Sequence, residues 1–87
     1  NGYFLDSLAW IKFKQGDYES ARRIFLEAIE HVEDDPVIWE HLGRTYERLE
    51  NRSAALEAYR RSLEIDPERE TARRRLDALE NGVANPE

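Results

Sequence analysis

The sequence predicts an all-α fold, namely an α-solenoid of two helical hairpins followed by a C-terminal capping helix. Three observations lead to this prediction. Apolar residues recur at spacings of three and four through most of the chain. Clusters of Gly, Asp, Asn and Pro interrupt that period, and the pattern repeats after about 34 residues. Together they predict helices at about 3–15, 18–33, 36–50, 52–65 and 67–81.

The first two predicted helices show the helical period most clearly. Leu5, Leu8 and Ile11 share one face of the first, which ends at the run Gln15-Gly16-Asp17. The second carries Ile24, Phe25, Ala28, Ile29 and Val32 and ends at Asp34-Asp35-Pro36. The next two breaks fall at Glu50-Asn51-Arg52 and at Asp66-Pro67.

Each of these breaks contains a residue suited to cap the helix that follows. A short polar side chain there can accept a hydrogen bond from the unpaired backbone donors of the first turn. A proline suits the first helical position, because its missing N–H has no partner there in any case. The predicted capping residues are Asp17, Asp35, Asn51 and Asp66, with Pro36 and Pro67 opening their helices.

A shift of 34 residues superimposes the first half of the chain on the second. It aligns Leu5 with Trp39, Leu8 with Leu42, Ala9 with Gly43, Asp17 with Asn51, Ala21 with Ala55, Phe25 with Tyr59 and Ala28 with Ser62. A further shift places Leu76 under Leu42 but Arg73 under Trp39 and Asp77 under Gly43. The fifth helix is therefore predicted to be a polar cap that ends the stack.

The chain of 87 residues is expected to form one domain. We place the first repeat at 2–35, the second at 36–69, the capping helix at 70–81 and a flexible tail at 82–87. Because the sequence contains no Met, even at its first position, we expect it to be a segment of a longer protein or a processed product.

Composition narrows the classes of partner. Charged residues make up 37% of the chain and the net charge is −6, which opposes nucleic-acid binding. The absence of Cys excludes disulfides and thiol chemistry, and fits the cytoplasm and a cysteine-poor bacterial periplasm equally. No apolar run approaches the roughly 18 residues that suggest a membrane span. We therefore expect no nucleic-acid partner and no membrane insertion, and the composition indicates no cofactor and no small-molecule substrate.

The second repeat resembles the tetratricopeptide repeat, whose pattern is Trp-x2-Leu-Gly-x2-Tyr followed by small, aromatic and small residues and a Pro. It matches at Trp39, Leu42, Gly43, Tyr46, Ala55, Tyr59, Ser62 and Pro67. The first repeat keeps Leu8, Ala9, Ala21, Phe25 and Ala28 but has Leu5, Lys12 and Glu33 in place of the Trp, Tyr and Pro. The resemblance covers about residues 2–81, and the run from Leu5 to Trp10 is similar to repeats of bacterial multi-repeat proteins.

The resemblance implies stacked hairpins in a right-handed superhelix whose concave groove holds a peptide or partner protein. It places the groove on Tyr3, Asp6, Ser7, Trp10, Phe13 and Lys14, on Val37, Glu40, His41, Arg44, Glu47 and Arg48, and on Thr71, Arg74, Arg75 and Ala78. Its aromatic and arginine-rich ends suit a peptide with an apolar anchor and an acidic part. In the alternative interpretation, Trp10 and Phe13 pack on a preceding repeat.

Chaperone-binding members of the family hold a terminal carboxylate in a clamp of Lys, Asn and Arg. At the corresponding positions this sequence has Asp6, Trp10 and His41, and only Arg75 agrees with the clamp. We therefore do not expect this chain to bind chaperone tails.

One edge of the first helix carries Phe4 and Ile11, where the second repeat has Ile38 and Thr45. Because the second pair would rest on the preceding hairpin, the first pair is expected to be exposed. Exposed apolar area of this kind usually marks an interface. We therefore expect that the chain either continues N-terminally in the native protein or self-associates through Phe4 and Ile11, and we predict that the isolated chain dimerises.

The sequence does not favour a catalytic or a metal-binding interpretation. His31 and His41, interpreted as surface residues, lie on different predicted helices and would need carboxylates such as Glu30 or Glu40 to hold zinc. Asp6, Ser7 and His41 approach the groove without an oxyanion hole or a nucleophile turn. The four glycines are isolated, so no phosphate-binding loop is expected. The chain is not expected to be an enzyme.

Two further patterns have structural explanations. The Arg22-Arg23, Arg60-Arg61 and Arg73-Arg74-Arg75 runs have acidic residues within a turn, as solvated helix faces do. Asn51-Arg52-Ser53 fits the glycosylation pattern, but Asn51 is better explained as a cap. Two functional hypotheses remain: a module that binds a partner in its groove, and an architectural or self-associating C-terminal end of a longer solenoid.

Overall fold

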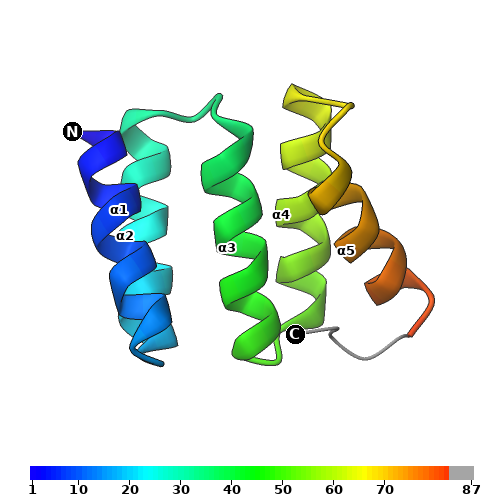
Figure 1. Cartoon of the computed structure of the whole chain (residues 1–87), viewed down its shortest axis with the longest axis horizontal. Helices are drawn as coiled ribbons and strands as arrows, with labels where there is room; N and C mark the ends of the chain where they lie inside the picture. The colour runs from blue at the N-terminus through cyan, green and yellow to red at the C-terminus, as the bar shows by residue number, and fades with distance from the viewer. Residues whose placement is uncertain (83–87) are drawn as a thin grey trace.

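The computed structural model describes residues 1–82 and consists of helices joined by short loops. Helices α1 (Gly2–Lys14) and α2 (Tyr18–His31) form one hairpin, and α3 (Pro36–Arg48) and α4 (Arg52–Ile65) form the next. Helix α3 packs on α2, and α5 (Glu70–Glu80) packs on α4, so the helices follow one another across the molecule (Figure 1). The predicted all-α architecture of two hairpins and a fifth helix is confirmed.

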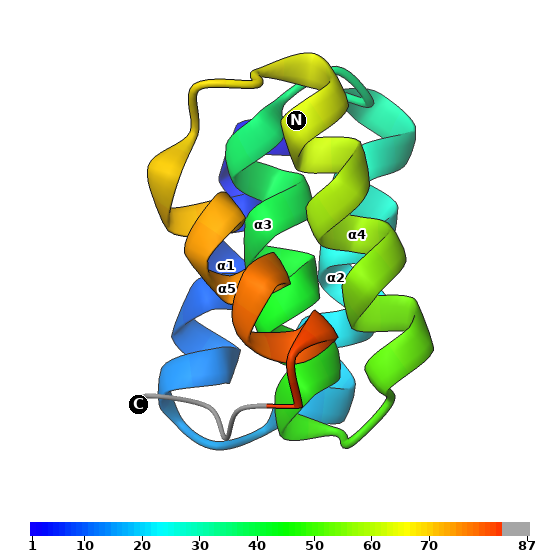
Figure 2. The ribbon, with the colours of Figure 1, turned by 90° about the vertical axis from the view of Figure 1, so that its right-hand side faces the viewer.

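The helices lie in two layers. Figure 2 shows α1, α3 and α5 on one side of the molecule and α2 and α4 on the other. The first helix of each hairpin and the capping helix therefore share a face, which we call the inner face. None of the helices within residues 1–82 has the length and apolar character that crossing a membrane requires.

Three of the predicted caps are confirmed, and they explain where the helices begin. Each side-chain oxygen accepts a hydrogen bond from a backbone N–H in the first turn of its helix. The bonds run from Ser20 to Asp17 at 3.2 Å, from Val37 to Asp35 at 2.8 Å and from Ala54 to Asn51 at 3.3 Å. The bonds from Ser20 also lower the pKa of the Asp17 carboxyl.

The predicted start of the fifth helix at Pro67 is wrong, because α5 begins at Glu70. Asp66 ends α4 in an extended conformation, and its carboxylate accepts the N–H of Glu68 at 3.1 Å. The Asp66 side chain therefore stabilises a local turn instead of capping α5. Pro67 lies within that turn and does not occupy the first helical position.

The residues that define the repeat pattern form the core. Phe25, Ile38 and Leu42 are almost fully buried where α2 meets α3, and Tyr59 and Leu76 are buried where α4 meets α5. The small residues Ala9, Ala21, Ala28 and Ala55 are fully buried among them, which lets the helices approach closely. Of the predicted flexible tail 82–87, all but Gly82 lies outside the described residues.

Candidate functional site

Three aromatic rings meet between the two hairpins. Trp10 and Phe13 come from α1, and their rings stack with centroids 4.6 Å apart and planes 6° apart. Tyr18, the first residue of α2, meets Phe13 edge-on at 5.2 Å. The spacing of three residues along α1 and the tight turn into α2 bring the rings together.

Cations from α3 and α1 cover these rings. The guanidinium carbon of Arg44 lies 5.1 Å from the Trp10 ring centroid. The guanidinium carbon of Arg48 lies 5.4 Å from the Phe13 ring centroid, and its Nη1 donates to the Tyr18 hydroxyl at 2.9 Å. Together with Lys14 these residues line a cavity of about 320 Å³, which we call the aromatic–arginine pocket.

The pocket is positively charged. Burial is the main cause that lowers the pKa of Arg44, and the charges of Arg75 and Arg48 lower it further. Cation–π contacts with the rings partly compensate for the burial of Arg44 and for its repulsion by the neighbouring arginines. The pocket therefore concentrates positive charge in a chain whose net charge is −6.

A polar pair lies beside the pocket and joins the two repeats. The Nδ1 atom of His41 lies 3.0 Å from an Asp6 carboxylate oxygen, and the His41 ring stacks on Trp10 with centroids 4.4 Å apart. The side chains of His41 and Asp6 are each only 19% exposed. The interpretation of His41 as a surface histidine is therefore wrong, because it packs between the hairpins.

Two predicted groove acids are engaged with other helices. Glu40 is 4% exposed and accepts from Arg69 Nε at 2.7 Å and from the Thr71 hydroxyl at 2.8 Å. Glu47 accepts from the Tyr59 hydroxyl and lies 3.6 Å from Arg75 Nη1. These contacts tie α3 to α4 and α5.

Several of the other predicted groove residues are exposed and do not line the pocket. Tyr3 is 61% exposed, and Ser7 and Arg74 are also exposed on α1 and α5. Phe13 is 6% exposed and forms the floor of the pocket. Sequence spacing missed Tyr18, because it lies beyond the turn, where positions on one helix no longer predict positions on the next.

The edge of α1 differs sharply from its counterpart on α3. Phe4 and Ile11 are 66% and 54% exposed, whereas Ile38 and Thr45 are 1% and 0% exposed. The second pair is buried where α3 packs on α2, and the Thr45 hydroxyl also donates to the His41 carbonyl at 2.8 Å. The same positions in two repeats therefore face a neighbouring hairpin in one case and open surface in the other.

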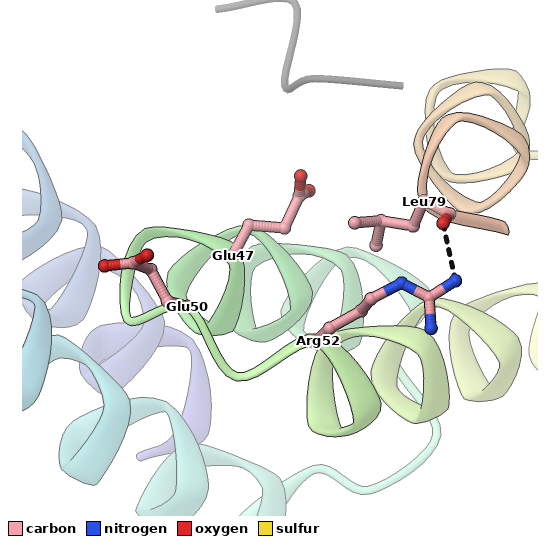
Figure 3. Close-up of a pocket in the computed structure, with 4 residues that line it drawn as sticks. All are labelled: Glu47, Glu50, Arg52 and Leu79. Carbon is pink, nitrogen blue, oxygen red and sulfur yellow. Dashed lines mark hydrogen bonds between the residues drawn. The ribbon is translucent and has the colours of Figure 1, made fainter. Parts of the chain in front are cut away.

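A second cavity of about 280 Å³ is lined by Glu47, Glu50, Arg52 and Leu79 (Figure 3). Arg52 donates from Nη2 to the Leu79 carbonyl at 2.7 Å. This carbonyl belongs to the last turn of α5, whose carbonyls lack intrahelical partners, and it also accepts the backbone N–H of Gly82 at 3.2 Å. The contact explains the position of Arg52 as a link between α4 and the end of α5.

The family model described as Tetratricopeptide repeat matches residues 7–70, which is most of the chain. The chain belongs to the tetratricopeptide repeat family. Tetratricopeptide repeats generally mediate protein–protein interaction, and the family is typically non-enzymatic.

A human protein, RANBP2-like and GRIP domain-containing protein 1, is 32% identical to this tetratricopeptide repeat chain over 78 residues. The match covers 76% of the chain but only 4% of the human protein. The likeness is therefore confined to a small part of a much longer relative. The expected similarity to bacterial repeat proteins stays a prediction.

Proposed function

We propose that this tetratricopeptide repeat chain is a protein-binding module that holds a segment of its partner against the inner face. The observation that carries the proposal is the aromatic–arginine pocket, whose lining comes chiefly from α1 and α3. Trp, Tyr and Arg are the residues most enriched among the energetic centres of protein interfaces. Their concentration on this face supports a binding role for it.

The surroundings of the pocket also support a preorganised surface. His41 is held by Asp6 and by the Trp10 ring, and Glu40 is held by Arg69 and Thr71. Side chains that are already fixed lose less conformational entropy when a partner binds. The inner face would therefore bind a segment with little rearrangement of its own.

Ser7 offers a way to block this face without disturbing the core. It is exposed and lies seven residues before Lys14, so the two share one side of α1. A Ser7→Arg variant places a bulky side chain beside the pocket. Ser53→Arg is the matched control, because Ser53 is equally an exposed serine but lies on α4.

The test is capture of partners from a host lysate by the purified chain, with helicity of each variant checked by circular dichroism. We expect wild type and Ser53→Arg to retain the same partner and Ser7→Arg to lose it. If Ser7→Arg retains that partner as well as wild type does, the inner face is not the binding surface.

A second candidate function is architectural, with the α1 edge serving as a contact between hairpins. The exposure of Phe4 and Ile11 supports it, because the equivalent Ile38 and Thr45 are covered by a neighbouring hairpin. In the isolated chain this edge would pair with the same edge of a second copy, since a self-complementary patch favours two-fold dimers.

Light scattering over a range of protein concentrations tests this candidate. We expect a monomer–dimer equilibrium for wild type and a monomer for a Phe4→Glu, Ile11→Glu variant. The control is Glu27→Gln, an exposed change on α2 that leaves the edge intact. A monomeric mass for wild type at high concentration would contradict self-association.

A further inference from the structure

We propose that Asn81 is a site of spontaneous deamidation, whereas Asn1, which also precedes a glycine, is protected by the fold. Within residues 1–82 the pair Asn-Gly occurs twice, at Asn1-Gly2 and at Asn81-Gly82. Neither pair belongs to the aromatic–arginine pocket, so the modification does not depend on the proposed function. The two pairs are held very differently, and that difference decides which of them reacts.

Deamidation of an asparagine needs only the backbone nitrogen of the following residue and water. The nitrogen attacks the side-chain carbon Cγ, the Cγ–Nδ2 bond breaks, and ammonia leaves with the proton of the backbone N–H. Water then opens the five-membered imide at one of its two carbonyls. The product is aspartate or isoaspartate, in which the main chain passes through the former side chain. A following glycine favours the reaction, because no Cβ hinders the approach of its nitrogen.

At the end of α5, the reacting nitrogen is freed by a small local opening. Asn81 and Gly82 are both exposed, directly after the last residue of the helix. The Asn81 side chain makes no hydrogen bond to another residue within 1–82. The Gly82 N–H donates to the Leu79 carbonyl at 3.2 Å, and that carbonyl also accepts from Arg52 at 2.7 Å (Figure 3). Release of one backbone hydrogen bond therefore frees the nitrogen, and the ends of helices open at little cost.

The first pair is built into the start of α1. The Asn1 carboxamide oxygen accepts the N–H of Phe4 at 2.9 Å, and the Asn1 carbonyl accepts that of Leu5 at 3.0 Å. Gly2 is the first residue of α1 and is buried, with the Val32 side chain where a Cβ would lie. Rotation of the Gly2 nitrogen onto the Asn1 carboxamide would break the cap and the first turn together. The structure therefore opposes the reaction at Asn1.

Deamidation at position 81 should weaken the last turn of α5. It adds a negative charge at the C-terminal end of the helix, where the helix dipole is also negative. Isoaspartate lengthens the main chain by one methylene as well, which would shift the Gly82 N–H from the Leu79 carbonyl. The bond from Arg52 to that same carbonyl joins α4 to α5. The modified chain should therefore hold α5 less firmly.

Two variants remove one asparagine each without altering the net charge. Asn81→Gln keeps an uncharged amide, but its longer side chain would have to close a six-membered ring, which forms far more slowly. Asn1→Ser removes the carboxamide of the first pair and keeps a side chain that caps a helix. Circular dichroism establishes that both variants have the helicity of wild type.

The experiment incubates wild type and both variants at pH 8 in water enriched in heavy oxygen. Released ammonia gives the total rate, and mass spectrometry with electron-transfer fragmentation gives aspartate and isoaspartate at each position. A parallel incubation in guanidinium chloride gives the rate of each asparagine in the unfolded chain. We expect Asn81 to react within about threefold of its unfolded rate, and Asn1 at least about tenfold more slowly than its own. Asn81→Gln should release little ammonia, and Asn1→Ser as much as wild type.

Equal protection of Asn1 and Asn81 by the fold would overturn the proposal. So would a reaction at Asn81 no faster than at Asn51, which caps α4 and precedes Arg52. Hydrogen exchange compares the α5 amides of fresh and fully modified wild type, and we expect exchange about threefold faster after modification. Unchanged exchange would overturn the weakening of α5.

Discussion

Gly16 and Glu50 occupy the same left-handed position in the turns of the two hairpins, with φ angles of 84° and 60°. In each turn the next residue donates its N–H five residues back, from Asp17 to the Lys12 carbonyl and from Asn51 to the Tyr46 carbonyl, both at 2.9 Å. A hydrogen bond of this kind at a helix end requires a residue with positive φ before its donor, and glycine is favoured at that position. The second repeat therefore carries a strain that the first avoids.

Replacing Glu50 with Gly should stabilise the chain by about 0.5–1 kcal/mol, because it removes the left-handed cost of a residue with a Cβ. Gly16→Ala should destabilise it by about 1 kcal/mol, and for a conformational reason alone, since nothing lies within 4 Å of the added Cβ. Urea denaturation measures both changes. Glu50→Ala is the control, because it removes the charge and keeps the strain. Equal stabilisation by Ala and Gly would assign the effect to charge.

The elements that were predicted correctly depend on local sequence. Asp17, Asp35 and Asn51 bind donors only two or three residues away, so their capping role could be predicted without knowing the rest of the fold. Asp66 looked equivalent, but its carboxylate accepts from Glu68 and α5 begins later. Two local hydrogen-bonding patterns compete for an Asp before a Pro, and the sequence does not decide between them.

The candidate site was predicted in part for a related reason. The resemblance to the tetratricopeptide repeat placed Trp10, Arg44 and Arg48 in one groove, and they line the same cavity. It did not predict that Glu40 and Glu47 would be engaged, because their partners Arg69 and Tyr59 come from outside α3. Spacing along one helix shows which side chains share a face, whereas their partners depend on how helices pack.

Gly43→Ala should destabilise the second hairpin. A Cβ at this position would lie 2.8–2.9 Å from three atoms of the Tyr59 ring, and Tyr59 is fully buried, so the ring has little room to move. Overpacking of this kind costs about 1–3 kcal/mol, which exceeds or matches the roughly 1 kcal/mol that Ala gains over Gly in a helix. Thermal and urea unfolding measure the net loss.

The control for this variant is Glu57→Ala, an exposed change on α4 that should leave the free energy of unfolding almost unchanged. If Gly43→Ala is as stable as wild type, the helices α3 and α4 can separate slightly at no cost. The close packing of Gly43 against Tyr59 would then not limit the sequence at this position.

Tyr59 makes folding stability depend on alkaline pH. Burial and its hydrogen bond to Glu47 raise the pKa of the Tyr59 hydroxyl well above its ordinary value of about 10. Because the folded pKa is raised, this contribution to stability is fully present below about pH 10. It is lost as the pH rises further, since the unfolded chain then releases the proton first. The free energy of unfolding should therefore decline above pH 10.

A Tyr59→Phe variant isolates that contribution. It should lose about 1–2 kcal/mol at neutral pH, because the side chain of Glu47 is only 6% exposed and loses a hydrogen-bond donor. Above pH 10 the difference in stability between the two proteins should narrow, because wild type loses the contribution of Tyr59. Urea denaturation at pH 7, 9 and 11 gives the comparison. A constant difference between the two proteins at all three values would show that Tyr59 does not link folding to pH.

Arg69 and Arg60 both connect α5 to the rest of the molecule, yet they should differ in importance. Arg69 Nε lies 2.7 Å from Glu40, with the two side chains 27% and 6% exposed. Arg60 Nη2 lies 3.0 Å from Glu80, with the two side chains 55% and 44% exposed. Loss of Arg69 leaves a buried carboxylate with less compensation, whereas loss of Arg60 leaves one that water can solvate.

Arg69→Ala should therefore cost about 3 kcal/mol, and Arg60→Ala less than about 1 kcal/mol. Urea denaturation gives both values, and hydrogen exchange of the α5 amides shows whether the helix detaches before the hairpins unfold. Adding Glu40→Gln to Arg69→Ala should recover part of the loss, because the neutral amide removes the uncompensated charge and can still accept from Thr71. If Arg69→Ala and Arg60→Ala cost the same, burial does not decide the strength of these pairs, and α5 is held chiefly by the apolar contacts of Ala72 and Leu76.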